Sequence, residues 1–64
     1  MDIPAAIQHI VDGQDLSQEQ ATQVFHTIMS GAATPAQIGA LLAALRVKGE
    51  TAEEIAGAAL TMRE

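Results

Sequence analysis

The two histidines are the first residues of this sequence whose chemistry could serve a function. His9 and His26 are the only histidines, and the sequence has no cysteine. A zinc site takes three or four ligands from the protein, and no carboxylate stands at a spacing that would pair with either histidine. We therefore predict no metal site in this chain, and we interpret both histidines as surface or boundary residues of helices.

Nucleophiles and phosphate-binding residues are equally scarce. Ser17 and Ser30 stand where a helix begins and where one ends, so their hydroxyls are explained as capping groups. Residues 30–34 contain one glycine, whereas a phosphate-binding loop is rich in glycine. Glu53 and Glu54 fall in the first turn of a predicted helix, where the helix dipole favours negative charge. We predict no catalytic, cofactor-binding or metal-binding residue, and we do not expect this chain alone to be an enzyme.

The charge balance narrows the possible partners. Eight acidic and three basic residues give a net charge of −5, and Phe25 is the only aromatic residue. Nucleic-acid binding needs a cluster of Lys and Arg to contact phosphates. The longest apolar run, residues 40–45, is far shorter than the roughly 20 residues that span a bilayer. We expect no nucleic-acid or membrane partner, and we predict a cytoplasmic location because no signal peptide or disulfide is visible.

Four apolar stripes recur at intervals of three and four residues, which is the period of an α-helix. The stripes are Ile3, Ala6, Ile7, Ile10 and Val11; Ala21, Val24, Phe25, Ile28 and Met29; Ile38, Leu41, Leu42 and Leu45; and Ile55, Ala58, Ala59 and Met62. We predict an all-α fold, a small antiparallel bundle of four short helices at about 3–12, 18–30, 35–48 and 52–64. Both methionines of the stripes are assigned to the core.

Capping signals support these boundaries. The last three helices each begin with a capping box, in which a hydroxyl and a longer side chain three residues later bond each other's backbone N–H groups. The pairs are Ser17 with Gln20, Thr34 with Gln37, and Thr51 with Glu54. Gly13, Gly31 and Gly49 follow the first three helices, where a left-handed residue is favoured. The equal spacing of the starts also suits a repeat array, but equal helices with short loops produce the same spacing.

The third predicted helix is apolar on two sides. Opposite its core stripe lies a second set of small apolar residues, which we name the alanine face. The alanine face consists of Ala36, Ala40, Ala43 and Val47. A helix that is apolar nearly all round is buried on both sides or contacts a partner, so this face is a candidate interface. The alternative is that alanine is present only because it is the best helix former.

The fourth predicted helix reaches the end of the sequence without a stop signal. No glycine, proline or polar loop follows Met62, although natural helices normally end on such residues. We therefore expect residues 1–64 to be a single helical domain that is cut inside or at the edge of a larger protein.

The second half of the sequence resembles a known enzyme family. Residues 34–40 read TPAQIGA shortly after Gly31, residues 44–51 read ALRVKGET, and residues 53–58 read EEIAGA. These motifs are similar to the N-terminal helical domain of the anthranilate phosphoribosyltransferase family. The first thirty residues match more loosely. Together with the second half, they extend the resemblance over essentially the whole chain.

The resemblance implies a parent enzyme of two domains, in which a large α/β domain carries the catalytic residues. Such enzymes transfer a phosphoribosyl group from phosphoribosyl pyrophosphate to anthranilate, with magnesium, in tryptophan biosynthesis. Their Gly-Thr-Gly-Gly-Asp loop and magnesium-binding carboxylates have no counterpart in these 64 residues, so no catalytic residue is carried over. The resemblance also implies a homodimer formed through the small domain, and a hinge that closes over the active site. The partners expected are therefore its own large domain and a second copy.

Two alternatives remain open at this stage. Pyrimidine nucleoside phosphorylases have a similar helical domain, although residues 48–51 favour the anthranilate enzyme. A free-standing helical adaptor, whose apolar groove accepts a partner helix, would also explain the alanine face.

Overall fold

The computed structural model describes residues 1–62, and this part of the chain folds into four α-helices without a strand. The helices are α1 (Ile3–Val11), α2 (Gln18–Met29), α3 (Pro35–Lys48) and α4 (Ala52–Met62). The predicted all-α fold is confirmed. The ends of α1 and α2 fall one residue earlier than predicted, which is a usual difference at helix termini. The predicted extension of the last helix to residue 64 lies outside the described residues.

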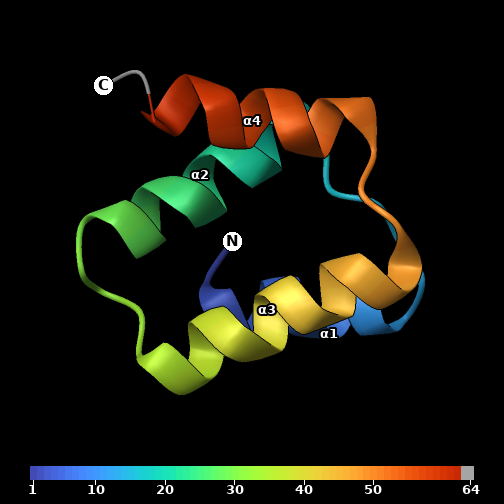
Figure 1. Cartoon of the computed structure of the whole chain (residues 1–64), viewed down its shortest axis with the longest axis horizontal. Helices are drawn as coiled ribbons and strands as arrows, with labels where there is room; N and C mark the ends of the chain where they lie inside the picture. The colour runs from blue at the N-terminus through green and yellow to red at the C-terminus, as the bar shows by residue number, and fades with distance from the viewer. Residues whose placement is uncertain (63–64) are drawn as a thin grey trace.

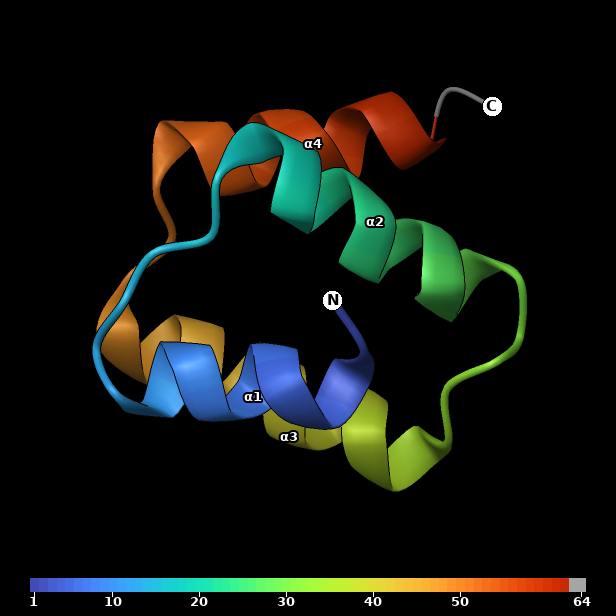
Figure 2. The same cartoon turned by 180° about the vertical axis from the view of Figure 1, so that it is seen from behind.

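The helices form two closely packed pairs, α1 with α3 and α2 with α4 (Figure 1). Consecutive helices run in opposite directions, which is consistent with the predicted antiparallel bundle. The members of each pair, however, are alternate helices in the chain and run in roughly the same direction, as both views show (Figure 2). Connectors 12–17 and 49–51 therefore both cross between the pairs at one end of the molecule, and connector 30–34 crosses at the other.

The predicted helix caps are present in the structure. Ser17 with Gln20 and Thr34 with Gln37 each form both hydrogen bonds of a capping box. In α4, the Glu54 N–H donates to the Thr51 hydroxyl and the Thr51 N–H donates to the Glu54 carboxylate. Gly13, Gly31 and Gly49 all have positive φ, as a residue that ends a helix in the left-handed region requires.

The core lies between the two pairs and receives side chains from every helix except α4. Its buried apolar residues are Ile3, Ala6, Ile10, Leu16, Ala21, Val24, Leu41 and Leu45. Leu16 belongs to connector 12–17, so this connector is part of the core. Phe25 and Ile28 of α2 are partly buried against the same cluster.

Helix α4 approaches α2 through its smallest residue. A Cβ built on Gly57 would lie 2.6 Å from the Cβ of Ala21 and 2.8 Å from the carbonyl oxygen of Gln18. The buried residues of α4 are Gly57, Thr61 and Glu54, which lie at helical spacing on one face. The contact with α2 is thus made by a small and polar face of α4.

The prediction that the stripe of Ile55, Ala58, Ala59 and Met62 is the buried face of α4 is therefore wrong. Ile55 and Met62 are 60% and 68% exposed, because α4 turns Gly57 toward α2 and its larger apolar residues outward. The core assignment of Met29 is also wrong, and Val11 of the first stripe is exposed as well. Met29 is the final residue of α2, and Val11 is the final residue of α1.

Candidate functional site

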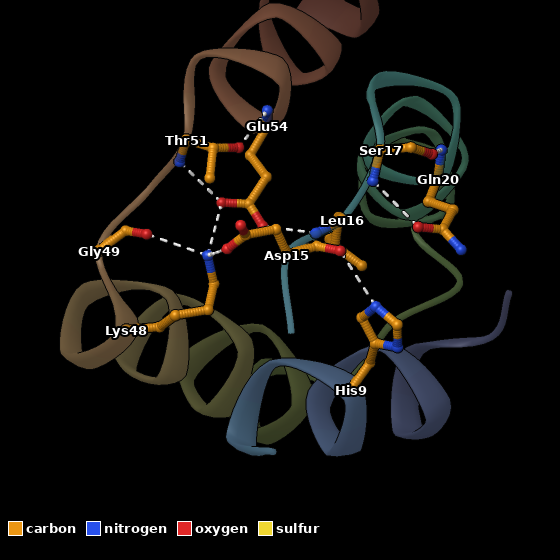
Figure 3. A network of polar contacts seen from close by, with 9 residues as sticks. All are labelled: His9, Asp15, Leu16, Ser17, Gln20, Lys48, Gly49, Thr51 and Glu54. Carbon is orange, nitrogen blue, oxygen red and sulfur yellow. Dashed lines mark hydrogen bonds and ion pairs between the residues drawn. The ribbon is translucent and has the colours of Figure 1, made fainter. Parts of the chain in front are cut away.

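A network of polar contacts ties connector 12–17 to the start of α4 (Figure 3). The Glu54 Oε2 accepts a hydrogen bond from the Leu16 N–H at 2.8 Å. Its Oε1 accepts from the Thr51 N–H and from the Lys48 Nζ, both at 2.9 Å. The same Nζ donates to the Asp15 Oδ1 at 2.8 Å. We name these five residues the connector network, because they join both connectors at this end of the molecule.

The contacts of the connector network favour the ionised forms of Glu54 and Lys48. Glu54 is 2% exposed, and burial raises the pKa of a carboxyl. The hydrogen bonds from the Leu16 and Thr51 amides and from Lys48 outweigh burial, so the pKa of Glu54 is lowered from its ordinary value of 4.5. The hydrogen bond to Asp15 raises the pKa of Lys48 above 10.5, against the effect of burial and with help from Glu54.

The connector network is arranged to join helices and does not present a reactive group. Within residues 1–62, every buried side-chain nitrogen or oxygen has a hydrogen-bond partner. Asp15 and Glu54 are the carboxylates that come together, and the Lys48 ammonium bonds both. Magnesium takes about six oxygen ligands in proteins, and no group of three His, Cys, Asp or Glu in the described part of the chain is placed to hold a metal ion. These residues therefore do not fit a magnesium site.

The histidines and Ser30, which the sequence also singled out, lie outside the connector network. The His9 Nε2 lies 3.0 Å from the carbonyl oxygen of Asp15, so this histidine contacts the backbone of a network residue. His26 is exposed on α2. The Ser30 hydroxyl donates to the carbonyl of Thr27 at 2.8 Å, at the end of α2.

Only part of the connector network is indicated by the sequence. The capping-box spacing predicted the contact of Glu54 with Thr51, and the helix dipole accounts for the exposed Glu53 beside it. The burial of Glu54, its ion pair with Lys48 and its bond to Leu16 were missed. A basic residue at a helix end gives no sign of its partner, and Leu16 is 38 positions away from Glu54.

The alanine face lies on the surface of α3. All four of its residues are exposed, and Val47 is 89% exposed. Part of this face borders a concave region of about 600 Å³ at the C-terminal ends of α1 and α3, which we name the α1–α3 groove. The groove is lined by Ile10, Val11, Gly13, Ala43, Ala44, Val47 and Lys48. Residues 1–62 therefore leave the predicted interface uncovered.

A second apolar groove opens between α3 and α4, with Phe25 of α2 among its lining residues. This α3–α4 groove has a volume of about 210 Å³. It is lined by Phe25, Leu42, Leu45, Glu50, Glu54, Ile55, Ala58, Ala59 and Met62. Leu42, which the sequence placed in the core stripe of α3, is 50% exposed here. None of the four described helices has the length and apolar character to cross a membrane.

Comparison with known proteins identifies the family. A family described as "Glycosyl transferase family, helical bundle domain" matches residues 4–64. The chain belongs to this family. The four-helix arrangement of the described residues agrees with a helical bundle domain.

Individual relatives of this helical bundle domain carry a more specific name. The chain is 56% identical over all 64 residues to an anthranilate phosphoribosyltransferase of Halorhodospira halophila, and it covers 19% of that protein. It is 60% identical over 62 residues, 97% of the chain, to that of Anaeromyxobacter dehalogenans, and covers 18% of it. The one from Teredinibacter turnerae is 53% identical over the whole chain, which covers 19% of it. The resemblance seen in residues 34–58 is confirmed, and the chain spans about a fifth of the length of these relatives. No solved structure matches the chain.

Proposed function

We propose that this chain is the N-terminal helical domain of an anthranilate phosphoribosyltransferase, and that it supplies contact surfaces while the rest of the enzyme supplies the chemistry. The observation that carries the proposal is the identity of 53% to 60% with relatives of that name. The two uncovered apolar grooves support a role in contacts.

The proposed parent enzyme transfers a phosphoribosyl group from phosphoribosyl pyrophosphate to anthranilate in the cytoplasm. We assign the phosphoribosyl pyrophosphate and magnesium sites to the remainder of the enzyme, because the described residues do not fit a magnesium site. In this assignment the helical domain forms the homodimer and moves as a lid over the active site of the large domain.

The proposed dimer contact is the alanine face. Small side chains allow two helices to approach closely, and a dimer would cover Val47 and the neighbouring groove. Charge placed on this face would be desolvated in the contact without a partner, which is costly. Ala43 is exposed, so a larger side chain there does not disturb the core of the single chain.

The activity is tested in a chimera, in which this chain replaces the aligned segment of the Halorhodospira halophila enzyme. We expect the chimera to transfer the phosphoribosyl group to anthranilate at a rate within about tenfold of that enzyme, and the chain alone to show no transfer. Transfer by the chain alone would contradict the proposal. A folded chimera without activity would favour a nucleoside phosphorylase domain or an adaptor instead.

The dimer contact is tested in the same chimera by sedimentation. We expect Ala40→Glu and Ala43→Glu to convert dimers to monomers, whereas Ala5→Glu, a change at an exposed alanine on α1, leaves the mass unchanged. A mass unaffected by the first two substitutions would remove the alanine face from the interface.

A further inference from the structure

Helix α4 has two faces suited to packing, and the described chain uses only one of them. Gly57 and Thr61 face α2, where Gly57 permits a close approach. The apolar stripe that includes Ile55 and Met62 lies outside that contact and remains exposed. An apolar stripe at helical spacing normally marks a face that is buried. No element within residues 1–62 buries this stripe.

The exposed stripe forms one wall of the α3–α4 groove. Leu42 projects from α3 on the opposite wall, so three large apolar side chains that are half or more exposed border one groove. Both helices lie on the side of the molecule that faces the viewer in Figure 1. Glu50 is an exposed carboxylate on the rim, while Glu54 is buried with its oxygens occupied by the connector network.

We propose that the α3–α4 groove is the docking surface for the polypeptide that follows α4 in the parent enzyme. This inference rests on the proposed function, because it requires a longer parent protein. The docking segment offers apolar side chains to Leu42, Ile55 and Met62. It presents a cationic or N–H donor group toward Glu50.

The position of Met62 is the reason for choosing this occupant. About four fifths of each relative lies outside the part that this chain covers, and Met62, at the end of α4, itself lines the groove. A segment tethered at the edge of a groove meets it at an effective concentration of about millimolar. Even a small apolar groove is then occupied, whereas a second copy of the chain has no such advantage.

The two grooves are separate enough to hold different occupants. Leu42 lines the α3–α4 groove and Ala43 lines the α1–α3 groove. Neighbouring residues of an α-helix point about 100° apart. The proposed dimer contact and the docking of the following polypeptide therefore use different sides of α3 and do not compete.

Cysteine labelling tests the docking surface, because this chain has no cysteine of its own. Ile55→Cys and Met62→Cys place a thiol in the groove. Leu60→Cys is the matched control, since Leu60 is 41% exposed on the same helix but does not line the groove. The rate of alkylation of each introduced thiol is measured by peptide mass spectrometry in the isolated chain and in the chimera.

We expect the thiols at positions 55 and 62 to react at least tenfold more slowly in the chimera than in the isolated chain, and the thiol at position 60 to change less than twofold. Equal rates in both contexts would overturn the proposal. Protection that appears in the isolated chain and grows with its concentration would assign the groove to a second copy and also overturn it. The transferase activity of the chimera is measured separately, so an active chimera with unprotected thiols refutes the docking surface and leaves the proposed function intact.

Discussion

The connector network and the α3–α4 groove meet at Glu54, yet they are built in opposite ways. In the network, the buried carboxylate has three hydrogen-bond donors supplied by the chain itself. In the groove, Ile55 and Met62 expose most of their apolar surface. A buried charge without partners is costly, whereas an exposed apolar patch marks a contact surface. Residues 1–62 thus satisfy their own buried polar groups but leave large apolar side chains exposed.

The largest expected effect comes from breaking the network. Glu54→Ala leaves the Lys48 ammonium and two backbone N–H groups without their buried acceptor, so we expect a loss of about 3–5 kcal/mol in the free energy of unfolding. Urea denaturation followed by circular dichroism measures it. The control is Glu53→Ala at an exposed neighbour, for which we expect a change within about 0.5 kcal/mol. Equal effects of the two substitutions would show that the network adds no stability.

The next largest effect on stability is expected at one of the two glycines that lie within helices, and not at the other. Gly57→Ala forces a methyl group against Ala21 and the backbone of α2, and we expect it to destabilise the chain by about 1–3 kcal/mol. A Cβ on Gly39 meets nothing within 4 Å, so Gly39→Ala improves helix propensity and stabilises by up to about 1 kcal/mol. Thermal unfolding of both variants gives the comparison. Stabilisation by Gly57→Ala would contradict the close approach of α2 and α4.

The stability of the chain depends on pH through the charges of Glu54 and Lys48. Because the folded pKa of Glu54 lies below 4.5, its contribution is complete above pH 4.5 and is lost as the pH falls through the folded pKa. Because the folded pKa of Lys48 lies above 10.5, its contribution is complete below pH 10.5 and is lost as the pH rises through the folded pKa. We expect the stability difference between the unsubstituted chain and Glu54→Gln to shrink as the pH falls below 4.5. The midpoints of urea denaturation across this pH range measure the stability difference. A difference that is independent of pH down to pH 2 would contradict an ionised Glu54 carboxylate in the folded chain.

The smallest effect on stability is expected for a substitution in the α3–α4 groove. Ile55→Ser in the isolated chain removes a side chain that is already 60% exposed, so we expect the free energy of unfolding to change by less than about 0.5 kcal/mol. Val24→Ser, in the buried core of α2, is the contrasting variant and destabilises strongly. Urea denaturation measures both. A large loss from Ile55→Ser would mean that the groove wall already packs within the chain.

The helices were predictable from the sequence, because their signals are local. The stripe of α1 and the capping residues Ser17 and Thr34 place elements by spacing alone. The pairing of α2 with α4 was not predictable, since it depends on how closely Gly57 approaches Ala21, and those residues are far apart in sequence. The same pairing reversed the predicted faces of α4.

The exposure of the alanine face was predictable from the sequence, and the connector network was not. Alanines on α3 opposite its core stripe indicate an uncovered face by periodicity alone. The sequence indicated that Glu54 caps a helix and lies in its first turn, where the helix dipole favours negative charge. Its burial required a partner from connector 12–17, which no local pattern marks.

Hydrogen exchange in α4 measures whether the rest of the enzyme covers the exposed apolar stripe of this helix. We expect the amides of residues 55–59 to exchange more slowly in the chimera than in the isolated chain. We expect Ile55→Glu to restore the faster exchange there and to leave α1 unaffected. Exchange rates in α4 that are the same in the isolated chain, in the chimera and in its Ile55→Glu variant would contradict the claim that this surface awaits the rest of the enzyme.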